Sequence, residues 1–185
     1  MKGELVLVTG GVRSGKSAFA QSMAEKSEGK VLFVATAQEL DKDMWERIRR
    51  HRESRPREWA TLEEPLDVAG ALRRWKGGCD FVLLDCVTLW VTNLLLRDED
   101  GPEESVLGPV HDVLEWRRRM SVSMVLVTNE VGMGVVPANT ISRRFSDLLG
   151  KANQMLAGAS DRVYLMVSGL PVQVKPGMDT KSRRG

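Results

Sequence analysis

The stretch Gly10-Gly11-Val12-Arg13-Ser14-Gly15-Lys16-Ser17 decides the fold of this chain. It fits the pattern G-x-x-x-x-G-K-[S/T], and it lies between a short apolar run at 5–8 and a helical pattern at 16–26. In such a loop the backbone N–H groups curl around phosphate oxygens, and the following helix directs its positive dipole end at them. A glycine-rich turn can match the pattern by chance, but the flanking strand and helix favour a phosphate-binding loop.

The side chains of this loop predict how it would hold a nucleoside triphosphate. Lys16 is spaced to reach the β- and γ-phosphates, and the Ser17 hydroxyl is spaced to bind Mg²⁺. Arg13 adds a second cation at the same place. Nucleotide contacts are expected along the whole loop, at Gly10, Gly11, Val12, Arg13, Ser14, Gly15, Lys16 and Ser17. The motif indicates neither which nucleotide is bound nor which reaction follows.

Short apolar segments alternate with amphipathic segments along the rest of the chain. Strands are expected at 5–8, 31–34, 81–84, 124–128 and 163–167, with a last one near 172–174; helices are expected at 16–26, 41–52, 65–75, 110–120 and 142–157. This alternation predicts an α/β fold with three layers, in which helices cover both faces of a mostly parallel sheet. We expect one domain over residues 1–175 and a polar, flexible tail over 176–185.

Composition narrows the class of protein. The chain has 185 residues, of which 42% are hydrophobic and 28% charged, enough for one sizeable core. Its 27 basic and 25 acidic residues give a net charge of +2, which disfavours nucleic acid as a partner. No apolar run approaches the roughly 20 residues of a membrane span, and two cysteines do not make a disulfide framework. A cytoplasmic protein without a membrane span is expected.

The third expected strand ends in an acid. Phe81-Val82-Leu83-Leu84-Asp85 is four apolar residues followed by a carboxylate, which is typical of the Mg²⁺-binding strand of nucleoside triphosphatases. Many strands end in Asp, and Asp85 could instead cap the next segment. Together with the phosphate loop, the pattern favours Mg²⁺ held by Ser17 and Asp85.

His51 allows two interpretations. Met44, Ile48 and His51 fall at helical spacing, so His51 lies on an apolar stripe, where a histidine commonly packs into the core. However, this helix follows the second strand, near the sheet edge where nucleotides bind, and neighbouring arginines could bring phosphate to it. A neutral imidazole is a competent nucleophile toward phosphorus. The other histidine, His111, has no phosphate-binding context.

A polar and glycine-rich segment follows the fourth strand. Residues 128–137 read TNEVGMGVVP, which predicts either an active-site loop or a long connection. Glu130 in this segment and Asp85 are both candidates for the base of a phosphoryl transfer. The residues alone do not choose between them.

Taken in order, these segments resemble the bifunctional cobinamide kinase/cobinamide-phosphate guanylyltransferases of cobalamin biosynthesis. The resemblance runs from about residue 5 to residue 175 with similar spacing. It is carried by VTGGVRSGKS at 8–17, ATA at 35–37, the arginine-rich stretch 47–56 around His51, LDCVT at 84–88, VTNLL at 91–95, TNEVGMGVVP at 128–137 and VSG at 167–169. The phosphate loop alone is unspecific, whereas the ordered set is specific.

The resemblance implies a RecA-like P-loop fold, a homotrimer and two reactions. A kinase step phosphorylates the aminopropanol hydroxyl of adenosylcobinamide from ATP or GTP, with Mg²⁺. A transferase step then moves GMP from GTP onto that phosphate and releases pyrophosphate, through a GMP–histidine adduct.

The matching nucleophile is His51, although some relatives have two adjacent histidines where this chain has Arg50-His51. The family acid at position 85 is often Glu, and the shorter Asp85 changes its reach. The family's further GTP contacts match Ala35, Thr36, Ala37, Arg52, Glu53, Ser54, Arg55 and Glu63.

Two other functions remain at this point. A plain P-loop kinase of small molecules or nucleotides would keep the phosphate loop and Asp85 but form no adduct on His51. A non-enzymatic, nucleotide-dependent regulator acting on nucleic acid is disfavoured, because the chain has no long basic stripe with interleaved aromatic residues.

Overall fold

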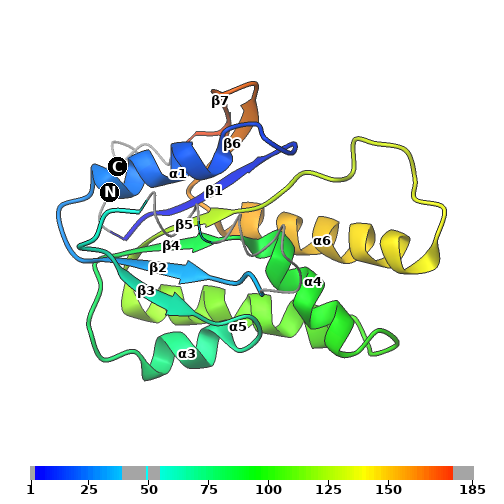
Figure 1. Ribbon diagram of the computed structural model, residues 1–185, viewed down its shortest axis with the longest axis horizontal. Coiled ribbons are helices and arrows are strands. Elements are labelled where there is room, and N and C mark those ends of the chain that lie inside the picture. The colour runs from blue at the N-terminus through cyan, green and yellow to red at the C-terminus, as the bar shows by residue number, and fades with distance from the viewer. Residues whose placement is uncertain (1–2, 39–48, 50–54, 177–185) are drawn as a thin grey trace, which may run out of the picture.

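A seven-stranded sheet with the order β3-β2-β4-β5-β1-β6-β7 forms the centre of the molecule (Figure 1). The computed structural model describes residues 3–38, 49 and 55–176. The strands are Leu5–Gly10 (β1), Val31–Ala35 (β2), Ala60–Glu63 (β3), Phe81–Asp85 (β4), Ser123–Val127 (β5), Arg162–Val167 (β6) and Leu170–Lys175 (β7). All neighbouring strands pair in parallel except β6 and β7, which form an antiparallel hairpin.

Helices cover both faces of this sheet. The described helices are Lys16–Glu25 (α1), Val68–Arg74 (α3), Val87–Arg97 (α4), Glu104–Met120 (α5) and Thr140–Ala159 (α6). Helix α1 lies on one face and the other four lie on the opposite face (Figure 1). Alternate residues of β1 serve the two layers: Val6 and Val8 join the core under α1, whereas Leu5 and Leu7 join the larger core under the other helices. The expected α/β fold with three layers, in which helices cover both faces of a mostly parallel sheet, is confirmed.

The parallel register brings the ends of the strands to one edge of the sheet. Ala35 at the end of β2 is paired with Asp85 of β4 and with Glu63 of β3, and Val8 of β1 is paired with Val127 of β5. We call this the carboxyl edge, and the opposite one the amino edge. In open α/β sheets ligands bind outside the carboxyl ends of the strands, so the predicted site residues should gather here.

Two elements were not predicted from the sequence. Strand β3 has only four residues and alternates between half-buried and exposed side chains, so it offers no apolar run. Helix α4 is buried against the sheet, α5 and α6, and Arg97 is its one charged residue, so it lacks the charged face that marks a helix in the sequence. Its Trp90 is 1% exposed and donates from Nε1 to the carbonyl oxygen of Leu66 at 2.9 Å.

Other boundaries differ by a few residues. The helix expected at 110–120 begins at Glu104, because Pro109 lies inside it and does not start it. Helix α6 begins earlier than expected, after Asn139, whose side chain accepts the N–H of Ser142 at 2.7 Å. The expected helix at 41–52 and the tail at 176–185 lie almost wholly outside the described residues. Among the residues that are described, no helix is long and apolar enough to cross a membrane.

Two leucines of α4 test the packing of the larger core. Leu94 is fully buried and Leu96 is 49% exposed on the same helix. Replacing Leu94 with Ala should lower the free energy of unfolding by about 3 kcal/mol, because a cavity remains in a packed core. The matched Leu96→Ala should cost less than about 1 kcal/mol. Urea unfolding followed by circular dichroism measures both, and equal costs would contradict this packing.

Candidate functional site

The loop between β1 and α1 has the shape of an anion cradle. Gly15 has φ 91° and forms the N-cap of α1, so the loop turns directly into the helix. Lys16 is only 8% exposed, and its Nζ donates to the carbonyl oxygen of Gly11 at 2.6 Å. The ammonium group is therefore held over the loop, where phosphate oxygens would meet it together with the first N–H groups of α1.

Strand β6 and the turn after it close this loop from one side. Gly10 has φ 147°, and a Cβ there would lie 2.6 Å from the carbonyl oxygen of Met166. The N–H of Gly169 donates to the carbonyl oxygen of Ser14 at 3.0 Å. A Cβ on Gly15 would lie 3.2 Å from the Cα of Gly169. The segment 167–169 is therefore part of the phosphate loop's support.

A hydroxyl group of the loop and one of β1 indicate that the loop binds a polar ligand. Ser14 of the loop is 8% exposed, and its Oγ has no hydrogen-bond partner among the described residues; the same holds for the buried Oγ1 of Thr9, near the end of β1. Buried polar atoms are normally satisfied, and exceptions gather where a ligand or water completes them. Phosphate oxygens would accept from the hydroxyl groups and from the loop amides.

The ends of β2 and β4 are tied together by a buried threonine. Thr36 is fully buried; its Oγ1 donates to the carbonyl oxygen of Cys86 at 2.7 Å and accepts the N–H of Cys86 at 3.1 Å. Asn93 of α4 donates to the carbonyl oxygens of Thr36 at 2.8 Å and Pro65 at 3.1 Å. The Asp85–Cys86 peptide bond between these groups is cis. Residues 35–37 are thereby fixed beside Asp85.

The acid predicted to bind metal is available for that role. Asp85 is half-buried, and its carboxylate makes no hydrogen bond or ion pair with another described residue. That part contains no group of three or more His, Cys, Asp and Glu side chains that could hold a metal ion. Mg²⁺ is usually held by one or two carboxylates together with substrate phosphates and water, so Ser17 and Asp85 fit Mg²⁺ that arrives with a nucleotide.

The segment after β5 is attached to the phosphate loop. The N–H of Glu130 donates to the carbonyl oxygen of Gly10 at 3.1 Å, and the carboxylate of Glu130 accepts the N–H of Gly132 at 2.7 Å. Asn153 of α6, which sequence reasoning did not single out, donates to the carbonyl oxygen of Asn129 at 3.0 Å. Thr88 of α4 accepts the N–H of Asn129 at 2.7 Å. In the sequence, Asn153 and Thr88 could have been found as polar residues inside the apolar pattern of a helix.

The described site residues meet at the carboxyl edge. Four strands end there, and at or just after their last residues lie the phosphate loop, residues 35–37, Glu63 and Asp85. The side chain of Glu63 is exposed. The Arg55 guanidinium lies 3.6 Å from the centroid of the Phe33 ring, on the face that carries α1. The other predicted site residues, His51, Arg52, Glu53 and Ser54, lie outside the described residues.

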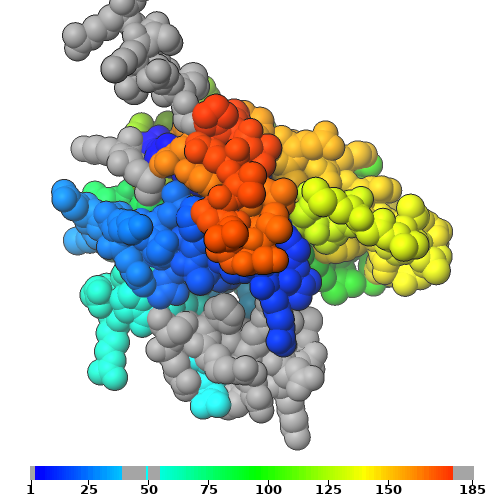
Figure 2. Space-filling model, turned by 90° about the horizontal axis from the view of Figure 1, so that it is seen from above, coloured from blue at the N-terminus to red at the C-terminus, as the bar shows by residue number. Residues whose placement is uncertain are grey.

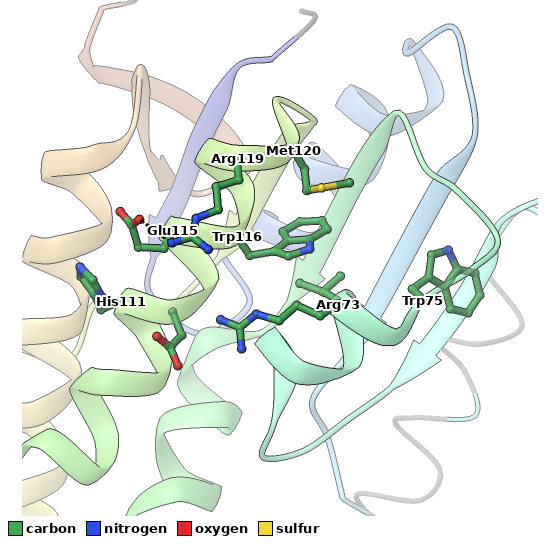
Figure 3. A pocket seen from close by; sticks show the side chains of 9 residues that line it. Arg73, Trp75, His111, Glu115, Trp116, Arg119 and Met120 are labelled. Carbon is green, nitrogen blue, oxygen red and sulfur yellow. Dashed lines mark ion pairs between the residues drawn. The ribbon is translucent and has the colours of Figure 1, made fainter.

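The second histidine lies in a different part of the molecule. His111 lines a cavity of about 520 Å³ between α3 and α5, toward the amino edge and across the sheet from α1 (Figure 3). Arg73, Trp75 and Trp116 also line it. The hydrogen bond from Arg118, opposed by desolvation, lowers the pKa of Glu115 there, and His111 adds a smaller charge effect in the same direction. None of the residues that line this cavity belongs to the phosphate loop.

Comparison with known proteins gives one consistent result. The profile of the family described as "Cobinamide kinase / cobinamide phosphate guanyltransferase" (CobU) matches residues 6–174. The "Bifunctional adenosylcobalamin biosynthesis protein CobU" of Escherichia coli is 40% identical over 181 residues, covering 92% of this chain and 99% of that protein. The "Bifunctional adenosylcobalamin biosynthesis protein CobP" of Pseudomonas aeruginosa is 43% identical over 173 residues, covering 91% and 96%. The CobU protein of Salmonella typhimurium is 40% identical over 181 residues, covering 92% and 99%.

Two neighbouring glycines test the closure of the phosphate loop. Gly10→Ala should lower the free energy of unfolding by about 2 kcal/mol or more, because its methyl group meets a backbone oxygen at a strained φ. A methyl group on Gly11 would have no atom within 4 Å, so Gly11→Ala should change stability by less than about 0.5 kcal/mol. Thermal unfolding and equilibrium dialysis with GTP measure stability and nucleotide binding. Comparable losses of stability in the two variants would contradict the close approach of β6 to Gly10.

Proposed function

This chain belongs to the cobinamide kinase/cobinamide phosphate guanyltransferase family, and from that premise we propose that it catalyses two successive transfers onto adenosylcobinamide in cobalamin biosynthesis. The observation that carries the proposal is the family match over residues 6–174, which includes a strand–loop–helix cradle for phosphate with unpaired buried hydroxyl groups. The first transfer is a phosphorylation and the second is a guanylylation.

In the kinase step, the hydroxyl oxygen of the aminopropanol arm attacks the γ-phosphorus of ATP or GTP. The bond from that phosphorus to the β-phosphate oxygen breaks, and the nucleoside diphosphate leaves. Lys16, Arg13 and the loop amides stabilise the negative charge on the phosphates. Asp85 takes the metal-binding role, which leaves Glu130, hydrogen-bonded through its backbone to Gly10, as the candidate acceptor of the hydroxyl proton.

Ser17 and Asp85, together with the phosphates, would hold Mg²⁺, which would supply positive charge to offset that of the triphosphate. Ser17 lies in the first turn of α1, and Asp85 ends β4, with β5 between the two strands. A carboxylate without a partner in the described chain supports this role, because binding the metal would then break no ion pair.

In the transferase step, we assign the nucleophile to His51. An imidazole nitrogen attacks the α-phosphorus of GTP, a phosphorus–nitrogen bond forms, and pyrophosphate leaves. A phosphate oxygen of adenosylcobinamide phosphate then attacks the same phosphorus, and the phosphorus–nitrogen bond breaks to give adenosylcobinamide-GDP and free His51. One difficult displacement is thereby divided into two easier ones.

Two observations support His51 over the other histidine. His51 belongs to the segment between β2 and Arg55. On either side of it, Ala35 at the end of β2 and Arg55 lie on the face of the sheet that carries α1. His111 lies across the sheet in the α3–α5 cavity. We further assign Ala35, Ala37, Arg52, Glu53, Ser54, Arg55 and Glu63 to GTP contacts, and to the fully buried Thr36 the role of holding Ala35 and Ala37 in place.

A homotrimer completes the proposal. Strand β7 is the last strand of the sheet, and its Val172 and Val174 are 50% and 61% exposed. Exposed apolar residues on an edge strand are a liability unless another chain covers them, which supports assembly through this edge.

The two histidines give the most direct test of the covalent step. With GTP labelled at the α-phosphorus and Mg²⁺, the protein should acquire acid-labile, alkali-stable label. His51→Ala should abolish this labelling because no atom replaces the nucleophile, yet keep most of the cobinamide kinase rate. His111→Ala should keep both activities. Equal loss of both activities in His51→Ala contradicts the division of roles, and a folded wild type without adduct favours a plain P-loop kinase.

Asp85 tests the metal role. Asp85→Asn should lower the kinase kcat about 100-fold at low Mg²⁺, because an amide oxygen carries no charge to hold the ion. Raising the Mg²⁺ concentration should recover part of the loss. Asp112→Asn, a position on α5 far from the carboxyl edge, should behave as wild type. If the kinase kcat of Asp85→Asn falls by the same factor at every Mg²⁺ concentration, Asp85 has a role other than binding the metal.

A further inference from the structure

Exposed apolar side chains occur on three segments at the carboxyl edge, each of which is part of the phosphate loop or hydrogen-bonded to it. They come from the loop itself, from the segment between β5 and α6, and from the strand ends on either side of the β6–β7 turn. We call this set the apolar rim; it comprises Val12 (78% exposed), Met133 (79%), Val135 (96%), Val136 (75%), Val167 (50%) and Leu170 (70%). The segment between β5 and α6 projects outward from the carboxyl edge (Figures 1 and 2).

Hydrogen bonds join two of the three parts of the rim to the phosphate loop, and the third part belongs to the loop. Glu130, at the base of the projecting segment, donates its N–H to Gly10 at 3.1 Å. Gly169, in the β6–β7 turn, donates its N–H to Ser14 at 3.0 Å. Val12 is part of the loop. A ligand resting on the rim is therefore positioned relative to the bound phosphates.

The rim is uncharged in a chain rich in charge. Residues 131–142 and 163–174 contain no Asp, Glu, Lys, Arg or His, whereas 28% of the whole chain is charged. Scattered exposed apolar residues need no explanation, but a group of them at one place marks a binding surface. These two segments carry no cation, so they do not suit a nucleotide, and their occupant is a different molecule from the one held by Arg13 and Lys16 of the loop.

The chemistry of phosphoryl transfer indicates what that occupant is. The acceptor hydroxyl must line up with the γ-phosphate, and the nucleotide fills the loop behind it. The body of the acceptor must then lie outward from the loop, where the rim is. Two cavities lined by described residues, of about 520 Å³ and 630 Å³, lie toward the amino edge, and these two cannot present a hydroxyl group to the loop.

We propose that the apolar rim binds the corrin macrocycle of the acceptor while its aminopropanol arm reaches into the phosphate loop. This inference rests on the proposed function and adds the place where the substrate docks. A corrinoid is a large, mostly uncharged macrocycle with amide arms, and an open apolar surface accommodates it better than a closed pocket. The same surface serves both transfers, because the phosphorylated arm remains attached to the macrocycle.

A double variant of the projecting segment tests the rim. Met133→Gln with Val135→Asn should weaken adenosylcobinamide binding by about tenfold or more, because two apolar contacts with the macrocycle are lost. Equilibrium dialysis gives the Kd, and steady-state kinetics should show a similar rise in KM for adenosylcobinamide. The Kd for GTP should stay within about twofold of wild type, since GTP binds through charges elsewhere. Met120→Gln, 57% exposed at the amino edge, is the matched control and should change nothing.

Three results are decisive. An unchanged Kd for adenosylcobinamide in the double variant overturns the proposal. Weaker binding accompanied by a change of oligomeric state in sedimentation velocity also overturns it, and assigns the rim to contact with a second copy of the chain. Weaker adenosylcobinamide binding with an unchanged oligomeric state supports the proposal. It does so even if His51 acquires no GMP, because that result contradicts only the proposed transferase step.

Discussion

The close approach of β6 to the phosphate loop is the constraint on which the site depends. At Gly10 the backbone passes so near the carbonyl oxygen of Met166 that a Cβ would lie 2.6 Å from it. The β6–β7 turn then bonds to Ser14 through Gly169. The loop is held open toward the carboxyl edge by neighbours that leave no room for side chains, so its amides and Lys16 are arranged before a nucleotide binds. Such preorganisation is what electrostatic stabilisation of a transferring phosphoryl group requires.

The parallel register extends this arrangement along the edge. Because β5 lies between β1 and β4, Glu130 is attached beside the phosphate loop while Asp85 lies one strand further on. Thr36 ties β2 to the peptide after Asp85, so the triphosphate-binding groups and the start of the His51 segment share one rigid border. In the proposed mechanism, a single bound triphosphate meets an acceptor at its γ-phosphate or His51 at its α-phosphate, so that one small fold would carry out two transfer reactions.

Local sequence was sufficient where the physical cause is local. The spacing within 10–17 predicted the loop, and the run ending at Asp85 predicted the strand end beside it. Local sequence was not sufficient where tertiary contacts determine the element. Helix α4 is buried on most sides and so lacks a charged face, and β3 is too short to carry a pattern. The supports Asn153 and Thr88 act across 24 and 41 residues of sequence, a relation that no local pattern reveals.

The central claim is that GTP held at the phosphate-loop edge transfers GMP to His51. The most direct measurement is mass spectrometry of peptides after incubation with GTP and Mg²⁺, using cleavage after glutamate at alkaline pH, where a phosphorus–nitrogen bond survives. The account predicts one added GMP on the peptide 47–53, which contains His51, and none on the peptide 105–115, which contains His111. GMP on the peptide 105–115, or no modified peptide from folded protein that binds GTP, would contradict the account.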